Sequence, residues 1–287
     1  MQDNNGWTPL HGAAAFGKVE VLRLLLESGA NLHMKDNGGW TPLHRAPALA
    51  KVEAFRLLRE HGADLYAKDN GDRTPLHAAT TFGMVEALIL LLEHGTNLHA
   101  KDNDGWTPLH RAVSVGEVEA LRLLLERGAD LHVKENGYWT PLHHAASNGK
   151  KQVLIVLLEH SSNLHAKDND SWTPLHHAPS VGQVEALRLF LEHGADLHEK
   201  DNGGWTPLHR AAAFAKVMAL RLALEHGSYL YAKDNGDQTP LHSATTIGKV
   251  AALRRLLEHG ADLHAKDNDG WIPHQEKKNC VLSVRTH

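Results

Sequence analysis

The sequence is poor in cysteine and in long apolar runs, and both shortages limit what the protein can be. Cys280 is its only cysteine, so a disulfide within the chain is excluded and a reducing compartment is favoured. No apolar run reaches the roughly 18 residues that a membrane-spanning helix needs. Residues 1–7 are polar and resemble neither a signal peptide nor a transit peptide. We therefore expect a cytoplasmic protein, with a nuclear location or unconventional secretion left open.

An excess of one charge is also lacking, because the formal net charge is only −4. Lysines recur along the chain and an acidic residue follows each one: Lys35-Asp36, Lys68-Asp69, Lys101-Asp102, Lys134-Glu135, Lys167-Asp168, Lys200-Asp201, Lys233-Asp234 and Lys266-Asp267. Since these two columns cancel, we expect no nucleic-acid partner and no membrane partner. The chain has no glycine-rich phosphate loop, nucleophile elbow or metal motif, so we expect no enzymatic activity and no cofactor.

What the sequence does have is a repeat with a period of 33 residues. The tetrapeptide Thr-Pro-Leu-His begins at Thr8, Thr41, Thr74, Thr107, Thr140, Thr173, Thr206 and Thr239. An alanine stands two residues after each of these histidines, and a ninth start at Trp271 keeps the spacing but loses the motif. A fixed period predicts a stack of similar units, each of which buries its apolar side against its neighbours.

This period and the motif Thr-Pro-Leu-His-x-Ala resemble the ankyrin-repeat family, over residues 3–274. The resemblance implies an all-α solenoid of stacked helix-turn-helix units joined by β-hairpin-like loops. It also implies a non-enzymatic scaffold that binds a protein partner on its concave face and hairpin tips. We expect a monomer whose partner the motifs do not identify.

The period divides the chain into eight full repeats, a partial repeat and a tail. Their boundaries are 3–35, 36–68, 69–101, 102–134, 135–167, 168–200, 201–233, 234–266, the partial 267–274 and the non-repeat tail 275–287. The first repeat has an apolar second helix and the tail has no repeat character, although terminal repeats usually carry polar outer faces. We expect a fragment or decayed product of a longer array, or a tail that folds back as a cap.

Within one repeat, residues 102–134, the pattern predicts a turn and two helices. Thr107 is placed to cap a helix and Pro108 suits its first position, so we expect a short helix over 108–115 that ends at Gly116. A second helix is expected over 117–127, with apolar residues at helical spacing and Gly128 at its end.

The residue before each Thr-Pro pair forms a row that holds all seven tryptophans. This tryptophan row contains Trp7, Trp40, Arg73, Trp106, Trp139, Trp172, Trp205, Gln238 and Trp271. Tryptophan is common at binding hot spots, so we expect the row to touch the partner. In the alternative interpretation each indole only stiffens its own hairpin.

A second row of similar side chains stands at the end of the first helix. This apolar row contains Phe16, Leu49, Phe82, Val115, Val181, Phe214 and Ile247, and only Asn148 is polar in the same register. It is expected either to form a shallow groove for a partner segment or to pack between successive repeats. From the two rows we select as partner-binding residues Trp40, Arg73, Trp106, Trp139, Trp172, Trp205, Gln238, Phe82, Val115, Val181 and Phe214.

The 24 histidines fall mainly into three columns, and their spacing argues against a metal site. Stacked helices lie about 8–10 Å apart, whereas zinc ligands lie about 2 Å from one ion. By resemblance, each Thr-Pro-Leu-His histidine ties its helix start to the neighbouring hairpin. The column that includes His61 and His94 suits helix C-terminal capping. The column that includes His132 leaves one alternative open, a substrate of a hydroxylase that modifies hairpin histidines.

Some positions break the pattern. Residues 38–77 match residues 203–242 at 31 of 40 positions, which indicates that five repeats were duplicated. Ala50, Ala215 and Ser161 replace helix-ending glycines, and Ala50 and Ala215 would each be strained by about 1 kcal/mol if their sites are left-handed. Pro47 and Pro179 fall inside first helices, where we expect kinks or shortening.

Overall fold

The computed structural model describes residues 2–46 and 52–273 of the 287-residue chain. These residues contain 16 helices and no strand, so the all-α prediction is confirmed. Pro47, Leu49, Ala50, His274 and the tail 275–287 lie outside the described residues. The chain divides into two compact units. Unit 1 comprises residues 1–145 and 155–162, and unit 2 comprises residues 146–154 and 163–287.

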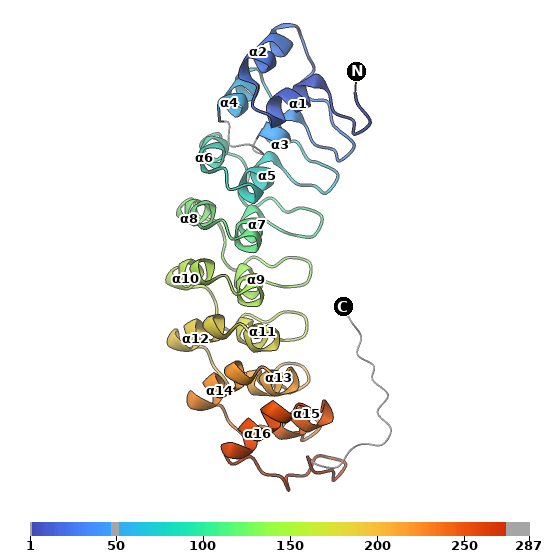
Figure 1. Ribbon diagram of the computed structural model, residues 1–287. Coiled ribbons are helices and arrows are strands. Elements are labelled where there is room, and N and C mark those ends of the chain that lie inside the picture. Colours follow the sequence, from blue (N-terminus) through green and yellow to red (C-terminus); the bar gives the residue numbers. More distant parts are fainter. Residues whose placement is uncertain (1, 47–51, 274–287) are drawn as a thin grey trace. The chain divides into compact units, whose positions relative to one another are not determined.

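Each repeat contributes a first and a second helix (Figure 1). The first helices are α1 (Pro9–Ala15), α3 (Pro42–Arg45), α5 (Pro75–Thr81), α7 (Pro108–Val115), α9 (Pro141–Asn148), α11 (Pro174–Val181), α13 (Pro207–Ala213) and α15 (Pro240–Thr246). The second helices are α2 (Val19–Glu27), α4 (Val52–Glu60), α6 (Val85–Glu93), α8 (Val118–Glu126), α10 (Lys151–Glu159), α12 (Val184–Glu192), α14 (Val217–Glu225) and α16 (Val250–Glu258).

The ends of the first helices follow from local sequence. Thr107 has extended backbone (φ −91°, ψ 167°), and Pro108 then begins α7 without needing an amide hydrogen. His110 is the third residue of the helix, and its side chain accepts a hydrogen bond from the Thr107 N–H in a capping box. Gly116 ends α7 in the left-handed conformation with φ 86°, where a glycine pays no steric cost. The predicted first helix over 108–115, ending at Gly116, is therefore confirmed.

The second helices are amphipathic, and the apolar side of each faces the first helices. In α8, Ala120, Leu121 and Leu124 are buried, whereas Glu119 and Glu126 are exposed. Burying a leucine side chain contributes about 2 kcal/mol relative to leaving it in water. The core therefore lies between the two helices of each repeat and between neighbouring repeats.

Each unit has the same two layers. In unit 1, α1, α3, α5 and α7 contact one another in sequence, and so do α2, α4, α6 and α8. In unit 2 the corresponding layers are α11, α13 and α15, and α12, α14 and α16. Figure 1 shows that the hairpin loops lie on the side of the first helices, away from the second helices. The hairpins and the first helices thus share one face of each unit.

The hairpin loops are hydrogen-bonded from repeat to repeat although they contain no strand. The main-chain N–H of Asn70 donates to the Gly38 carbonyl oxygen at 3.0 Å, and its side-chain amide donates to the Asn37 carbonyl oxygen at 2.9 Å. Asn235 makes the equivalent main-chain bond to Gly203 at 3.0 Å in unit 2. These bonds hold consecutive loops in register.

Residues that replace helix-ending glycines keep the glycine conformation. Ala215 and Ser161 have left-handed backbone, with φ of 53° and 61°. Pro179 was expected to kink or shorten its helix, and the helix is not shortened, because α11 has eight residues, the same length as α7. Pro179 removes only one helical N–H, and α11 is held by its packing against α12 and α13.

Candidate functional site

Each hairpin is organised around a carboxylate from the column of acidic residues. Five of these residues are buried: Asp36, Asp69, Asp102, Asp201 and Asp267. In the second repeat, Oδ1 of Asp36 accepts hydrogen bonds from the N–H groups of Gly38 at 2.8 Å and Trp40 at 3.0 Å. Burial raises the pKa of the Asp36 carboxyl, but the hydrogen bonds from Arg45, Trp40 and Gly38 outweigh it and hold the pKa below its usual value. The carboxylate stays charged and fixes the turn that presents Trp40.

The second carboxylate oxygen is bound by a side chain from the first helix of the same repeat. Arg45 in α3 donates from Nη2 to Oδ2 of Asp36 at 2.5 Å. Arg111 and Arg210 bind Asp102 and Asp201 in the same way. These arginines directly follow the histidine of the Thr-Pro-Leu-His motif, and the sequence interpretation missed them.

The same arginines lie against the tryptophans. The guanidinium carbon of Arg45 lies 4.7 Å from the centre of the Trp7 ring and 4.4 Å from that of Trp40. In the fifth repeat His144 takes this place, with ring centres 4.6 Å from Trp106 and 5.0 Å from Trp139. Tryptophans from the hairpins therefore alternate with arginine or histidine from the first helices, and we call this arrangement the hairpin stack.

Unit 2 contains a hairpin stack of its own. Arg210 lies with its guanidinium carbon 3.6 Å from the centre of the Trp172 ring and 4.7 Å from that of Trp205. Cation–π contacts of this kind contribute about 0.5–2 kcal/mol. The tryptophans are half-buried in both units, and the cation–π contacts of Trp7 and Trp172 join consecutive repeats.

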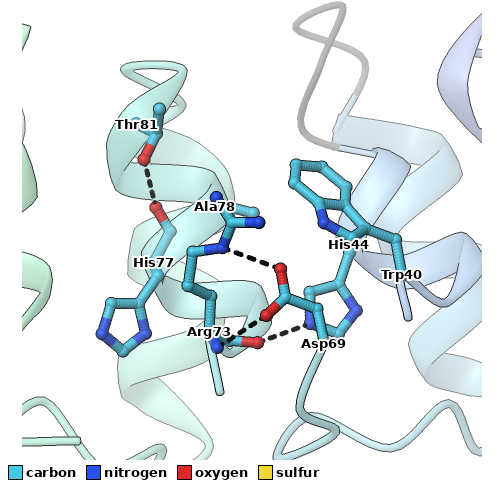
Figure 2. Close-up of a pocket in the computed structure, with 7 residues that line it drawn as sticks. All are labelled: Trp40, His44, Asp69, Arg73, His77, Ala78 and Thr81. Atoms are coloured by element: carbon cyan, nitrogen blue, oxygen red, sulfur yellow. Dashed lines mark hydrogen bonds and ion pairs between the residues drawn. The ribbon is translucent and has the colours of Figure 1, made fainter. Parts of the chain in front are cut away.

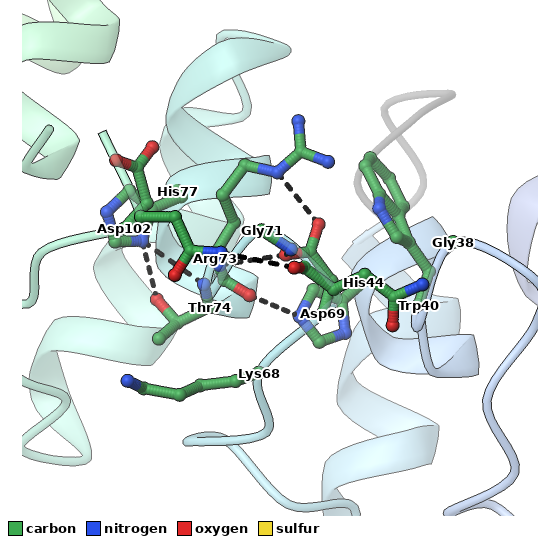
Figure 3. A network of polar contacts seen from close by, with 12 residues as sticks. Gly38, Trp40, His44, Lys68, Asp69, Gly71, Arg73, Thr74, His77 and Asp102 are labelled. Carbon is green, nitrogen blue, oxygen red and sulfur yellow. Dashed lines mark hydrogen bonds and ion pairs between the residues drawn. The ribbon is translucent and has the colours of Figure 1, made fainter. Parts of the chain in front are cut away.

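One member of the tryptophan row, Arg73, is organised differently (Figure 3). Ala78 stands in α5 where repeats two, four, five, six and seven have the arginine or histidine of the hairpin stack. Arg73 instead binds the buried carboxylate from the hairpin, since its Nε donates to Oδ2 of Asp69 at 2.8 Å. Its guanidinium carbon lies 5.6 Å from the centre of the Trp40 ring. The hairpin carboxylate is thus still paired with an arginine, but this arginine comes from the hairpin and not from the first helix.

At the corresponding position in unit 2, Gln238, the hairpin carboxylate is hydrogen-bonded without an arginine. The indole Nε1 of Trp205 donates to Oδ2 of Asp234 at 3.0 Å, and the amide of Gln238 donates to Asp267 at 3.2 Å. Ser243 stands where the hairpin stack has arginine or histidine elsewhere. The two interruptions of the tryptophan row are therefore paired by the duplication but differ in charge and in hydrogen bonding.

The apolar row is exposed in both units. The exposed fractions in unit 1 are 57% for Phe16, 43% for Phe82 and 39% for Val115. In unit 2 they are 44% for Val181, 48% for Phe214 and 49% for Ile247. These side chains are therefore partly exposed, and Phe82 also contacts Trp40 of the preceding repeat, so both interpretations of the row stay open.

The motif histidines are structural. His77 accepts from the Thr74 N–H through Nδ1 at 3.2 Å and donates from Nε2 to the Trp106 carbonyl oxygen at 3.1 Å, so the ring is held neutral as one tautomer. Burial lowers the pKa of His77 to about 4, although the bond to Trp106 opposes the shift. Burial likewise lowers the pKa of His110 to about 4. The predicted tie between helix start and neighbouring hairpin is confirmed.

The other two histidine columns differ from this one. His61 and His94 cap their helices, with Nδ1 at 2.8 Å from the Leu57 carbonyl oxygen and at 2.7 Å from that of Leu90. His132 is exposed on its hairpin. Among the described residues no group of three or more histidine, cysteine or acidic side chains is arranged to hold a metal ion.

Lysines of the lysine column bridge consecutive hairpins. Lys35 and Lys101 donate from Nζ to the carbonyl oxygens of Lys68 and Lys134, both at 2.7 Å, and so bridge consecutive hairpins. The acidic column accepts hydrogen bonds from the turn and from the first-helix and hairpin side chains described above. The lysine and acidic columns therefore cancel in charge, but their side chains make different contacts.

The comparisons with known proteins agree with this geometry. The family model for ankyrin repeats matches residues 1–69, 66–135, 128–201 and 180–267. The chain belongs to the ankyrin-repeat family, whose members generally mediate protein–protein interactions. A search of the curated proteins gives no match. In the described part of the chain, no helix is long and apolar enough to cross a membrane.

Proposed function

We propose that the protein is a non-enzymatic scaffold that binds a protein partner on the face formed by the hairpins and the first helices. The observation that carries this proposal is the exposed apolar row. Phe82 and Phe214 leave roughly half of a large apolar side chain in water, each in line with further apolar side chains of its own unit. Aligned exposed apolar side chains are a recognised mark of an interaction surface.

The hairpin stack supports this proposal by holding the neighbouring surface rigid. Arg45 is bound to Asp36 and lies between two indoles, so its position is fixed before any partner arrives. A preorganised surface loses less conformational freedom on binding. The apolar row supplies the contact area, and the half-buried tryptophans and their arginines form its edge.

Affinity capture from a lysate of the source cells, followed by mass spectrometry, tests this function. The test variant carries Phe82→Ser with Val115→Ser in unit 1, and a second variant carries Val181→Ser with Phe214→Ser in unit 2. The control carries Val21→Ser with Leu24→Ser, since these side chains are 49% and 63% exposed on the second helix α2. Partners held by the control and lost from either test variant support the proposal; partners retained by all variants would contradict it.

A further inference from the structure

The hairpin stack of unit 1 has a gap at α5. Ala78 presents only a methyl group where Arg45 and Arg111 each place a guanidinium in their own repeats. A small pocket remains, with a volume of about 30 Å³, and Figure 2 shows Trp40 and Arg73 on either side of it. This volume suits a small polar group rather than a whole drug-sized ligand.

The gap is rich in hydrogen-bond donors. Arg73 uses Nε to bind Asp69, while its two terminal nitrogens make no hydrogen bond with any described residue. Its side chain is 40% exposed, against 26% for Arg45 and 22% for Arg111. Figure 2 shows these terminal nitrogens on the side of the guanidinium that faces away from Asp69. A planar guanidinium that still has four of its five N–H groups can bind a second carboxylate in the bidentate manner.

The indole Nε1 of Trp40 is a further hydrogen-bond donor, and comparison with the duplicated repeat in unit 2 shows that it lacks an acceptor. In unit 2 the equivalent indole, Trp205, donates from Nε1 to Asp234 at 3.0 Å. In unit 1 the equivalent carboxylate, Asp69, is already taken by Arg73, and Trp40 Nε1 makes no hydrogen bond with the described residues. With arginine in place of the glutamine found in unit 2, two kinds of donor in unit 1 have no acceptor within the described residues. They are the terminal nitrogens of Arg73 and Nε1 of Trp40.

The strong acceptors around the gap are already engaged. Asp69 accepts from the N–H groups of Gly71 and Arg73 through Oδ1 and from Arg73 through Oδ2, each at 2.8 Å (Figure 3). His44 donates from Nε2 to the Arg73 carbonyl oxygen at 3.0 Å. A guest group that brings its own negative charge and acceptor oxygens is therefore complementary to this gap.

An exposed apolar side chain adjoins the donors. Phe82, 43% exposed, meets the Trp40 ring edge-on with their ring centres 6.4 Å apart. An acidic residue seated against Arg73 would place its sequence neighbours on this aromatic pair. The gap therefore selects for a segment in which an acidic residue stands among apolar ones.

We propose that the gap formed by Trp40, Arg73 and Ala78 binds the side-chain carboxylate of a glutamate or aspartate in a partner protein, with an adjoining apolar side chain on Trp40 and Phe82. The proposal rests on the proposed function, since it names the chemistry of the partner for one part of the same face. Its counterpart in unit 2, with Gln238 and Ser243, has no cation to offer.

Calorimetric or NMR titration with two synthetic peptides tests this proposal on the full chain. Both peptides are acetylated and amidated and carry two phenylalanines around one central residue, which is glutamate in the first and glutamine in the second. We expect the glutamate peptide to bind about tenfold more tightly, the advantage of a charge-assisted hydrogen-bonded pair. Equal affinities, or no binding of either peptide up to millimolar concentration, would overturn the proposal.

Three variants distinguish binding in the gap from attraction of the peptide by general surface charge. Arg73→Gln creates the residue found at the paired position, where Trp205 shows how the indole satisfies the carboxylate, and it should remove the preference for glutamate. Ala78→Arg adds a positive charge but fills the gap, so the glutamate peptide should bind more weakly; tighter binding would mean that charge alone attracts it. Arg122→Gln removes an arginine of similar exposure, 42%, from α8 and should change nothing.

The outcome is separable from that of the proposed function. A chain that captures a partner through Phe82 and Val115 but does so equally well with Arg73→Gln keeps its function and loses this inference. A thermal melt of each variant shows whether it is folded, and a variant that melts like the wild type while losing the glutamate preference locates the effect in the gap.

Discussion

The guanidinium carbon of Arg210 lies 3.6 Å from the centre of the Trp172 ring, which belongs to the preceding repeat. The same guanidinium binds the buried carboxylate of Asp201 in its own repeat. One side chain thus joins two repeats by a cation–π contact and closes a hairpin by an ion pair. Its removal should affect stability far more than the removal of an ordinary surface arginine.

Arg210→Met tests this dual role. It leaves Asp201, whose side chain is 2% exposed, without its charged partner, and we expect a loss of about 2–4 kcal/mol in the free energy of unfolding. Arg221→Met is the matched control in the same unit, because the Arg221–Glu225 pair is exposed to solvent and its removal should cost much less stability. Urea unfolding of both variants gives the comparison, and equal losses would contradict the role assigned to Arg210.

Because of the buried histidines, we expect the free energy of unfolding to decrease in mild acid. Burial lowers the pKa of His77, His110, His176 and His209 to about 4, so these rings stay neutral in the folded protein while they take up protons in the unfolded chain. The unfolded state therefore binds more protons between about pH 6.5 and 4, and each pKa unit corresponds to about 1.4 kcal/mol per group.

Equilibrium unfolding in urea at a series of pH values checks this prediction. The free energy of unfolding should be nearly constant from pH 8 to 7 and should decrease steeply as the pH falls from about 6.5 towards 4. The variant His77→Gln should show a shallower decrease, since one titrating group is removed. A stability that stays constant down to pH 5 would show that the motif histidines do not depend on being neutral.

A glycine at position 215 should stabilise the protein. Its φ of 53° is left-handed, where alanine is strained and glycine is not, so Ala215→Gly should raise the free energy of unfolding by about 1 kcal/mol. Ala213→Gly, two residues earlier in helix α13, should act in the opposite direction by a similar amount, because glycine weakens a helix. Chemical unfolding of the two variants measures both signs, and a destabilising Ala215→Gly would be inconsistent with the strain.

The fold was predictable because its signals are local. A threonine cap, a proline at the first helical position and a glycine at the end define α7 within a few residues, and the 33-residue period then repeats the result. The role of the motif histidines followed from the family resemblance. The length of α11 was not predictable, since it depends on packing that offsets the missing N–H of Pro179.

The candidate site was only half predictable. The two rows were visible as positions, but the contact of Arg45 with Trp7 joins repeats and needs the spacing between them. The sequence does contain a signal, since Arg73 and Gln238 in the row occur with Ala78 and Ser243 at the helix position instead of arginine or histidine. Among the full repeats, only the first departs from this correlation, with Trp7 in the row and Gly12 at the helix position. The exposed fraction of each side chain in the apolar row was not predictable, because the period does not specify how far the neighbouring repeat covers it.

The most direct test of the central claim, that the apolar row faces the partner, is photo-crosslinking in the source cells. A photoreactive phenylalanine analogue would be placed at Phe82 in one chain and at Leu24, on the exposed side of α2, in another. We expect a discrete crosslinked protein from position 82 and none from position 24. A crosslink from position 24 alone would place the partner on the second helices and contradict the account.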